Sequence, residues 1–569
     1  VLMIPLWTYI DRTYIAPKYP AQIPAVQSAD EQVPTKPPAL TNERLDSQDA
    51  TLAAGQEVAE VPTEEITAVL HNGKVQLEVT SLGGGIKAAT LLEFPEHNEK
   101  DSDPVVLDFS DAPALVYDSI DGIGASQSLA LQKSDDDRSA TFSGTLASGI
   151  VFQRTLAFAN DDYLLTVKDR FFNPENSSIT IDRARILTGR MQNPVDTKTM
   201  KGISILGVDS YTPAGGINYW GRKLHKLYGK SDALVIDTVP ADMTDVKVDW
   251  VSAKNKFFTQ ILRPEEPAAT MAILSSREAG EKKVVPETVS AALTFINQPI
   301  PAGESLELNY SYYIGPKDYS ILRDSGYAME KVMEFETTGF WSGMNWLMEP
   351  SRKFLLWTMN KFYGLIPNYG LAIILLTLLI RILFWPLTHK STESMKRMQE
   401  LQPEIKALQE KYKKEPQRLQ QETMKLYKEK KVNPMGGCLP MFVQIPVFIA
   451  LFTVLRNAIE LRFSGFLWIA DLSQPENLFA GSVPFVGALN ILPIVMSLSM
   501  IWQQKLSSPA TAATPEQQQQ QKMMMIMMPI MMLFFFYTMP SGLVLYWTTS
   551  NLLMIAQTGL RNLKKKAKA

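Results

Sequence analysis

The chain of 569 residues is poor in the side chains that most often build cross-links and metal sites. It has one cysteine, Cys438, which excludes an intramolecular disulfide framework and a zinc finger with several cysteine ligands. Its four histidines lie far apart in the sequence, and none has the HExxH spacing that a zinc protease needs. We therefore expect no metal site.

A large excess of charge of one sign is also missing. The 56 Lys and Arg residues nearly balance the 59 Asp and Glu residues, which excludes a strongly basic nucleic-acid binder and an acidic disordered tail. The balance hides two unequal parts. Residues 389–569 contain 21 basic and 11 acidic residues, a net charge of +10, so residues 1–388 carry a net charge of −13.

Long apolar runs are present, and they crowd into the last third of the chain. A run of 18 residues is about 27 Å long as a helix, close to the thickness of a bilayer core. We predict five membrane-spanning helices, at about residues 368–388, 437–456, 483–503, 523–539 and 541–560. The alternative is a set of buried helices in a soluble domain, but few amphipathic helices remain to cover them.

The first part of the chain divides into two segments before any strand pattern begins. Residues 1–16 open on ten apolar residues and predict a partial N-terminal transmembrane span; a signal-peptide remnant and an interfacial segment are the alternatives. Residues 17–61 are rich in Pro, Ala, Gln and acidic side chains. That composition predicts a disordered linker.

Residues 62–335 show short runs in which apolar and polar residues alternate, such as KVQLEVT at 74–80 and LELNYSYYI at 306–314. Alternation with period two, punctuated by turn signals, predicts a β-sandwich domain. Residues 336–367 mix aromatic and basic residues at a longer period. We predict an amphipathic helix in the membrane interface there, with a linker helix packed on the β-domain as the alternative.

The basic residues indicate the topology. Twelve basic and seven acidic residues lie in 389–434, and five more basic residues end the chain. Because basic loops stay in the cytoplasm, we expect this segment and the C-terminus there, and the β-domain on the opposite side. Spacings of three and four predict a helical hairpin over 389–434, either a solvated pair or a docking arm. Its basic candidates for partner contact are Lys396, Arg397, Lys411, Lys413 and Lys414.

Arg381 interrupts the first apolar run about 10 Å from its predicted cytoplasmic end. A charge at such a depth costs about 2.5–3.5 kcal/mol and is a functional candidate. The other four runs contain no acidic residue, so Arg381 should face water or carbonyl groups. We predict a hydrophilic groove open to the cytoplasm, lined by Arg381, Thr377, Gln444, Ser550 and Asn551. The alternative is that Arg381 extends to the lipid headgroups.

Three motifs near these runs are specific: NPMGGCLP at 433–440, QIP at 444–446 and PSGLVLYW at 540–547. With Arg381 they resemble the YidC/Oxa/Alb family of membrane protein insertases over roughly residues 340–566. The β-region, which ends on YIGPK at 313–317, is similar to the large periplasmic domain of the Gram-negative type. Trp547 stands where the family commonly has Tyr.

The resemblance implies a periplasmic β-supersandwich followed by an α-helical five-span insertase core over 368–566, in the inner membrane of a Gram-negative-type bacterium. It implies insertion and folding of new membrane proteins, alone or with the Sec translocon, without enzymatic activity or cofactor. Implied partners are nascent membrane proteins, the Sec translocon, the ribosome, the signal recognition particle pathway and the lipid bilayer, with no sequence-specific nucleic acid. The implied client-contact surface comprises Ile445, Pro446, Phe448, Met528, Phe534, Tyr546 and Trp547.

Two other functions compete with an insertase. A transporter predicts internal repeats and ionisable residues on several spans, whereas these runs hold one Arg and no evident repeat. A membrane-anchored periplasmic protein that acts on or binds carbohydrate predicts paired carboxylates in the β-domain, which sequence alone does not reveal.

Overall fold

The computed structural model describes residues 64–566, with gaps at 121–122, 193–205, 213, 222–223, 229–233, 245, 278–285, 337–342, 414, 431, 433–438, 484–486 and 508–514. The described residues form two compact units, of which the first ends at Val332 and the second begins at Met333. The segments predicted as a partial span (1–16) and a linker (17–61) lie outside the described residues, as does most of the NPMGGCLP motif.

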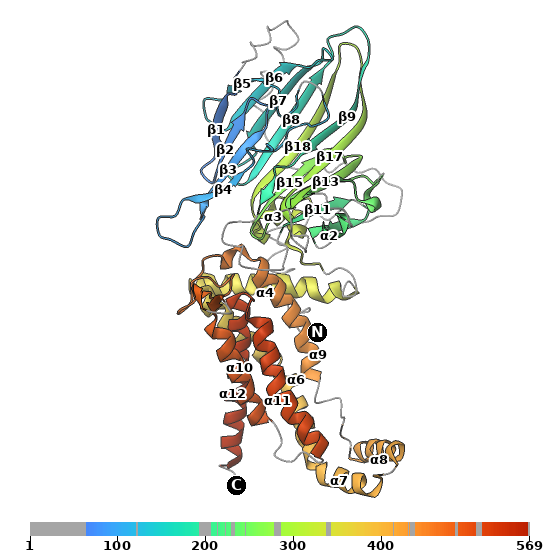
Figure 1. Cartoon of the computed structure of the whole chain (residues 1–569), viewed down its shortest axis with the longest axis vertical. Coiled ribbons are helices and arrows are strands. Elements are labelled where there is room, and N and C mark those ends of the chain that lie inside the picture. The colour runs from blue at the N-terminus through green and yellow to red at the C-terminus, as the bar shows by residue number, and fades with distance from the viewer. Residues whose placement is uncertain are drawn as a thin grey trace. The chain divides into compact units, whose positions relative to one another are not determined.

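The first unit is built from antiparallel sheets, as the alternating sequence pattern predicts (Figure 1). Its largest sheet has nine strands, and the alternating burial along its central strands shows which side faces the core. In spatial order they are β12 (Gly216–Tyr219), β11 (Gly207–Thr212), β14 (Trp250–Lys254), β15 (Phe258–Pro264), β18 (Ser305–Pro316), β8 (Leu164–Phe172), β7 (Val151–Phe158), β6 (Ser139–Thr145) and β5 (Ala130–Lys133).

Two smaller sheets complete this unit. The long strand β17 (Pro286–Ile300) is the centre of a five-stranded sheet and also packs against β11 and β14 of the large sheet. Its companions are β10 (Met191–Gln192), β16 (Thr270–Arg277), β13 (Val235–Thr238) and β9 (Ile179–Leu187). The third sheet runs in order through β1 (Thr67–His71), β2 (Val75–Thr80), β3 (Ile86–Pro95) and β4 (Pro104–Asp108). The short helices α2 (Leu224–Leu227) and η4 (Ala241–Met243) connect strands, and α3 (Tyr319–Asp324) and η5 (Met329–Met333) follow the last strand.

A buried ion pair lies at the centre of the large sheet. Arg154 on β7 and Asp169 on β8 are both 0% exposed, and two hydrogen bonds of 2.7 and 2.6 Å join them. Arg154 also donates to the carbonyl oxygens of Gly84 and Leu115. Such a pair is stable only when its remaining polar atoms are bonded, and these contacts supply the bonds that the guanidinium needs.

Two tyrosines complete the same network. The Tyr117 hydroxyl donates to Asp169 Oδ2 over 2.8 Å and lies 2.7 Å from the Tyr310 hydroxyl. Burial raises the pKa of both tyrosine hydroxyls above their ordinary value, so both stay protonated and able to donate. Tyr117 comes from a loop and Tyr310 from β18, so the network connects segments far apart in the sequence.

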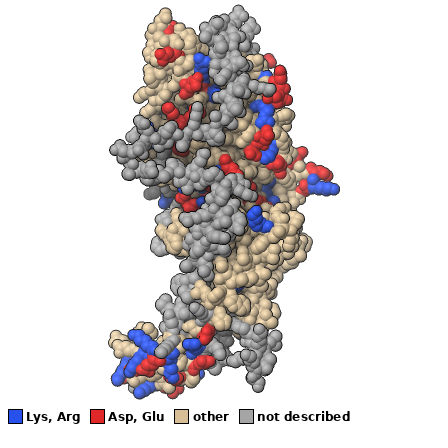
Figure 2. Space-filling model, turned by 180° about the vertical axis from the view of Figure 1, so that it is seen from behind, with Lys and Arg blue, Asp and Glu red and all other residues tan. Residues whose placement is uncertain are grey.

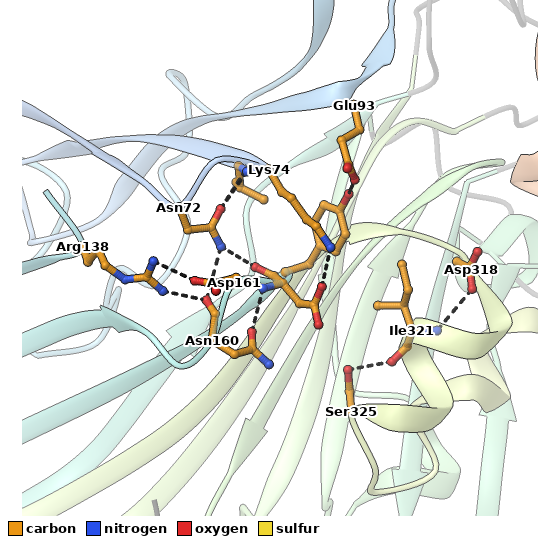
Figure 3. A network of polar contacts seen from close by, with 12 residues as sticks. Asn72, Lys74, Glu93, Arg138, Asn160, Asp161, Asp318, Ile321 and Ser325 are labelled. Atoms are coloured by element: carbon orange, nitrogen blue, oxygen red, sulfur yellow. Dashed lines mark hydrogen bonds and ion pairs between the residues drawn. The ribbon is translucent and has the colours of Figure 1, made fainter. Parts of the chain in front are cut away.

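A second, more exposed network joins the small sheet to the large one (Figure 3). Lys74 pairs with Asp162 at 2.6 Å, and Asn72 donates to the Asp162 carbonyl over 2.6 Å. Nearby, the Tyr163 hydroxyl donates to Glu93 over 2.7 Å. The side chains of Lys74 and Asp162 are 34% and 49% exposed, so solvent screens their attraction.

The second unit is helical (Figure 1). Beyond the helices it contains a two-stranded sheet of β19 (Leu478–Val483) and β20 (Gly487–Leu489). The helices are α4 (Asn345–Leu365), α5 (Tyr369–Leu383), α6 (Trp385–Glu400), α7 (Gln402–Lys411), α8 (Pro416–Glu429), α9 (Leu439–Asn457), η8 (Ile459–Leu461), α10 (Ile491–Ser507), α11 (Pro515–Phe536) and α12 (Ser541–Lys566).

Each predicted span overlaps a helix, α5, α9, α10, α11 or α12, but the bounds differ. The third differs most: α10 begins at Ile491 rather than near residue 483, because residues 487–489 pair with β19 as a strand. Within the described part of the chain, no helix combines the length and the apolar character needed to cross a membrane.

Helix α4 occupies the segment predicted as an interfacial helix. It packs on α5 and α9, with Phe354, Leu355 and Met359 buried, whereas Trp346 is 66% exposed. The buried Arg352 donates to the Phe335 carbonyl oxygen. Helix α4 therefore packs most of its apolar residues against α5 and α9 and leaves Trp346 exposed. Its place in the membrane interface stays a prediction.

The segment predicted as a helical hairpin contains α6, α7 and α8. The first arm of the hairpin is divided at Leu401 into α6 and α7. Pro403 is the second residue of α7, where the N–H that proline lacks would have no partner within the helix. Helix α8 begins at Pro416, because the fixed φ of proline suits the first turn of a helix. Leu401, Ile405 and Leu426 form an apolar core between α7 and α8, and Lys430 pairs with Glu404 at 2.8 Å.

Loss of the buried ion pair should destabilise the first unit far more than loss of the exposed one. We expect Arg154→Leu to cost about 3–5 kcal/mol, because Asp169 is then buried without its cation. Lys74→Met, the control, should cost at most about 1 kcal/mol. Hydrogen exchange of β7 and β8 in the full chain measures both, and equal losses would contradict the assignment.

Candidate functional site

Helix α12 lies among three helices that contribute predicted groove residues or their partners: α5, α9 and α10. Its first turn is fixed by the segment between η8 and β19, because Ser541 N–H donates to the Gln474 carbonyl over 2.8 Å and Gly542 N–H to the Leu472 carbonyl over 2.9 Å. These bonds satisfy donors that the start of a helix leaves free.

Arg381 lies near the end of α5 and reaches α12. Its Nη2 donates to the carbonyl oxygen of Ser550 over 2.9 Å and to the Ser550 hydroxyl over 2.6 Å. No carboxylate among the described residues pairs with it, and its Nε and Nη1 atoms make no hydrogen bond there. The structure therefore brings Arg381 and Ser550 together, with a carbonyl group as one partner, as expected.

Gln444 on α9 also faces α12. Its side-chain amide donates to the Tyr546 hydroxyl over 2.7 Å, and Tyr546 is only 1% exposed. Tyr546 precedes Ser550 by four residues, so the two lie on the same side of α12. A tyrosine expected on the client-contact surface thus lies in the interior beside the polar residues.

The other two predicted groove residues point elsewhere. The Thr377 hydroxyl donates to the Ile373 carbonyl of its own helix over 2.7 Å. Asn551 donates from its amide to the Ser499 hydroxyl on α10 over 3.0 Å. Neither is hydrogen-bonded to Arg381, because both are bonded to other partners.

Three aromatic side chains from three helices form the aromatic cluster: Phe448 on α9, Phe536 on α11 and Trp547 on α12. The ring centres of Phe448 and Trp547 lie 5.2 Å apart in an edge-to-face arrangement, and Phe536 lies 5.3 Å from Trp547. Phe536, at 1% exposure, is a residue that sequence reasoning missed. In the run of three phenylalanines at 534–536, no local signal marks which ring is buried.

Helix α11 also presents an exposed apolar face, here named the methionine-rich stripe. Its members recur at helical spacings of three and four, and each is between 48% and 76% exposed. They are Met523, Ile526, Met527, Ile530, Met531 and Phe534. Of the other predicted client contacts, Ile445 is 38% exposed, whereas Pro446 and Met528 are half-buried.

The predicted basic candidates of the hairpin are partly occupied. Arg397 pairs with Glu393 at 2.8 Å, and the Lys411 ammonium lies over the Tyr412 ring. Lys413 is exposed, nothing is described of the Lys396 side chain, and Lys414 lies outside the described residues. Figure 2 shows side chains of both signs mixed over this region, while the described helices elsewhere in this unit are mostly uncharged.

A polar cluster that the sequence did not reveal closes one end of the helices. Glu476 accepts hydrogen bonds from the Trp468 indole and from Leu492 N–H at the start of α10. The side-chain amide of Asn490 donates to the Tyr537 carbonyl over 2.6 Å, and the Tyr537 hydroxyl donates to the Ala488 carbonyl over 2.8 Å. These partners lie 8 to 49 residues apart, so no local motif could predict them.

Comparisons with known proteins match both units. The family described as 60Kd inner membrane protein matches residues 361–568, and the YidC periplasmic domain matches residues 67–350. The membrane protein insertase YidC of Syntrophus aciditrophicus is 34% identical over 85% of this chain and 82% of the relative. That of Pelobacter propionicus is 30% identical over 92% and 94%. A solved structure of an active YidC insertase is 19% identical, covers 90% of this chain and 97% of that one, and has a TM-score of 0.34.

A close approach at Gly370 near the start of α5 is a test of the packing around this site. A Cβ atom there would lie 2.1 Å from the ring of Phe466. We expect Gly370→Ala to destabilise the protein by about 1–3 kcal/mol, because the ring must move. Gly364→Ala, where nothing lies within 4 Å, should instead be neutral or stabilising by at most about 1 kcal/mol. Thermal unfolding in detergent compares them, and the same shift in both variants would refute the packing argument.

Proposed function

Because the chain belongs to the YidC family of membrane protein insertases, we propose that its helical unit passes newly made membrane proteins into the bilayer through a hydrophilic groove beside Arg381. Relatives across most of its length are named as insertases, so no enzymatic reaction is assigned to it. The groove and its residues rest on the arguments that follow.

One observation carries the proposal: Arg381 has donors to offer. A single nitrogen, Nη2, is held by Ser550, and no described carboxylate neutralises the charge. A guanidinium that is held at one corner keeps a fixed position while its remaining N–H groups can bind an acceptor. The polar segment of a client, above all a carboxylate, would form charge-assisted hydrogen bonds there.

Polar neighbours would lower the cost of bringing such a segment into an apolar setting. Transfer of a polar group from water without a new hydrogen bond costs about 2–7 kcal/mol, depending on the reference state. Gln444 and Tyr546 lie on the same side of α12 as Ser550 and are already bonded to each other. They can exchange partners with a client segment without a buried group losing its last bond.

The methionine-rich stripe suits the apolar part of the same client. Flexible thioethers adapt to many partner shapes, and an exposed apolar surface of this extent indicates contact with lipid or protein. An apolar segment that leaves water gains about 25 cal/mol per Å². We propose that clients pass from Arg381 along Ile445, Phe448 and the stripe into lipid, with the buried Tyr546 and the half-buried Trp547 supporting that route from within.

The topology is part of the proposal. Five helices, α5, α9, α10, α11 and α12, would span the inner membrane, with the hairpin of α7 and α8 and the C-terminus in the cytoplasm and the β-rich unit in the periplasm. The excess of basic residues in 389–434 supports this orientation. We further propose that the hairpin meets ribosomes and the signal recognition particle pathway, and that the unit also works with the Sec translocon.

Substitution of Arg381 tests the charge directly. Arg381→Ala should lower insertion of clients whose translocated segment is acidic by roughly tenfold or more, the worth of a charged hydrogen bond. Clients with neutral segments should lose less than about threefold. Arg381→Lys should keep much of the activity, because a point charge remains. Protease protection of clients in cells depleted of their own insertase gives the inserted fraction.

A control removes an equal charge elsewhere. Lys505 is exposed near the end of α10, and Lys505→Ala should leave insertion of both client types unchanged. If acidic and neutral clients respond alike to Arg381→Ala, the electrostatic role of Arg381 is wrong.

A further inference from the structure

Helix α12 is hydrogen-bonded through side chains to three different helices. Tyr546 accepts from Gln444 on α9, Ser550 accepts from Arg381 on α5, and Asn551 donates to Ser499 on α10. The α12 residues in these bonds are at most 7% exposed. Polar bonds between otherwise apolar helices restrict which rotations of α12 are possible.

Ser550 and Asn551 are neighbours in sequence but face different helices. Successive residues are turned by about 100° around a helix, because 3.6 residues complete a turn. A rotation that breaks the bond between Asn551 and Ser499 must therefore also move Ser550 relative to α5. The position of Ser550 in turn fixes Arg381, because Arg381 Nη2 donates to both the carbonyl and the hydroxyl oxygen of Ser550.

We propose that Asn551 is a positioning residue for Arg381, which acts through α12 by fixing the helix against Ser499. This inference rests on the proposed function, since it gives Asn551 a task in placing Arg381 for clients. The two residues are not hydrogen-bonded to each other. It also changes the predicted place of Asn551, whose amide serves the contact between α10 and α12 rather than the client.

The two sides of this bond respond differently to substitution. The Ser499 hydroxyl also donates to the Met496 carbonyl over 2.6 Å, so it keeps a partner when Asn551 is replaced. Asn551→Leu therefore removes the bond without leaving an unpaired buried group, and the protein should still fold. Ser499→Ala instead leaves the Asn551 amide buried without that acceptor, and it should lower the Tm more.

The first test compares client types. Asn551→Leu should lower the ratio of acidic to neutral clients inserted by roughly three- to tenfold, about the worth of one hydrogen bond. Insertion of neutral clients should change little, which a general loss of structure would not allow. Thr548→Val is the matched control: Thr548 is 4% exposed on the same helix, and its hydroxyl donates over 2.8 Å to Val544 of that helix. It should leave the ratio unchanged.

The second test does not depend on insertion. Asn551→Leu, Arg381→Met and the double variant of the full chain are compared with the unsubstituted protein by thermal unfolding in detergent. If Asn551 positions Arg381, the double variant should lower the Tm by less than the sum of the single shifts, because both changes remove the same arrangement.

The outcomes separate the two proposals. Additive Tm shifts overturn the positioning role, whatever the insertion results are. An unchanged client ratio in Asn551→Leu also overturns it when Arg381→Ala does change the ratio. If Arg381→Ala itself has no effect on the ratio while the Tm shifts are non-additive, the proposed function fails and the structural coupling stands.

Discussion

The arrangement of the helical unit depends on one constraint: polar side chains placed between apolar helices must find partners inside the protein. Helix α12 meets this constraint with three side chains that each bond to a different neighbouring helix. The apolar contacts around them supply most of the stability, but they do not select a single rotation of the helix. The bonds do, because each is made in one orientation only.

The β-rich unit solves the same problem at a different place. The alternation of β7 puts Arg154 on the side that faces the core, among aromatic and aliphatic neighbours. Asp169 and two backbone carbonyl groups then satisfy the guanidinium, and two tyrosine hydroxyls extend the network. In each unit an arginine, Arg154 or Arg381, lies at a position where an apolar side chain would avoid the cost of removing a charge from water. In the strands Asp169 neutralises the charge of Arg154, whereas no described carboxylate pairs with Arg381 on α5.

Those parts of the fold whose signal is local in the sequence could be predicted. The alternation of apolar and polar residues predicts the strands, and the first apolar run predicts the position of α5. A charge inside an apolar run also marks Arg381 as a candidate functional residue. The motifs also led to the family, because their order and spacing are specific.

The partners of these residues could not be predicted, because contacts across helices leave no local pattern. No residue next to Asn551 in the sequence indicates that it faces Ser499 rather than Arg381. A rotation of α12 by about 100° would bring Asn551 to the position that Ser550 occupies. Strand β20 was missed because its apolar residues continue into α10. The family resemblance places Tyr546 on the client-contact surface, whereas Tyr546 is buried and bonded to Gln444, about a hundred residues earlier.

The bonds of Tyr537 have a consequence for how α11 is aligned along its own axis. The helix is nearly repetitive at its end, with methionines followed by three phenylalanines, so a slip by one residue would replace one thioether or ring with another of the same kind. Apolar packing alone would hardly distinguish those alignments. Tyr537 follows the last phenylalanine, and its hydroxyl and carbonyl oxygen bond to the segment before α10. A single polar residue just beyond its last turn thus helps to give a low-complexity helix one defined register.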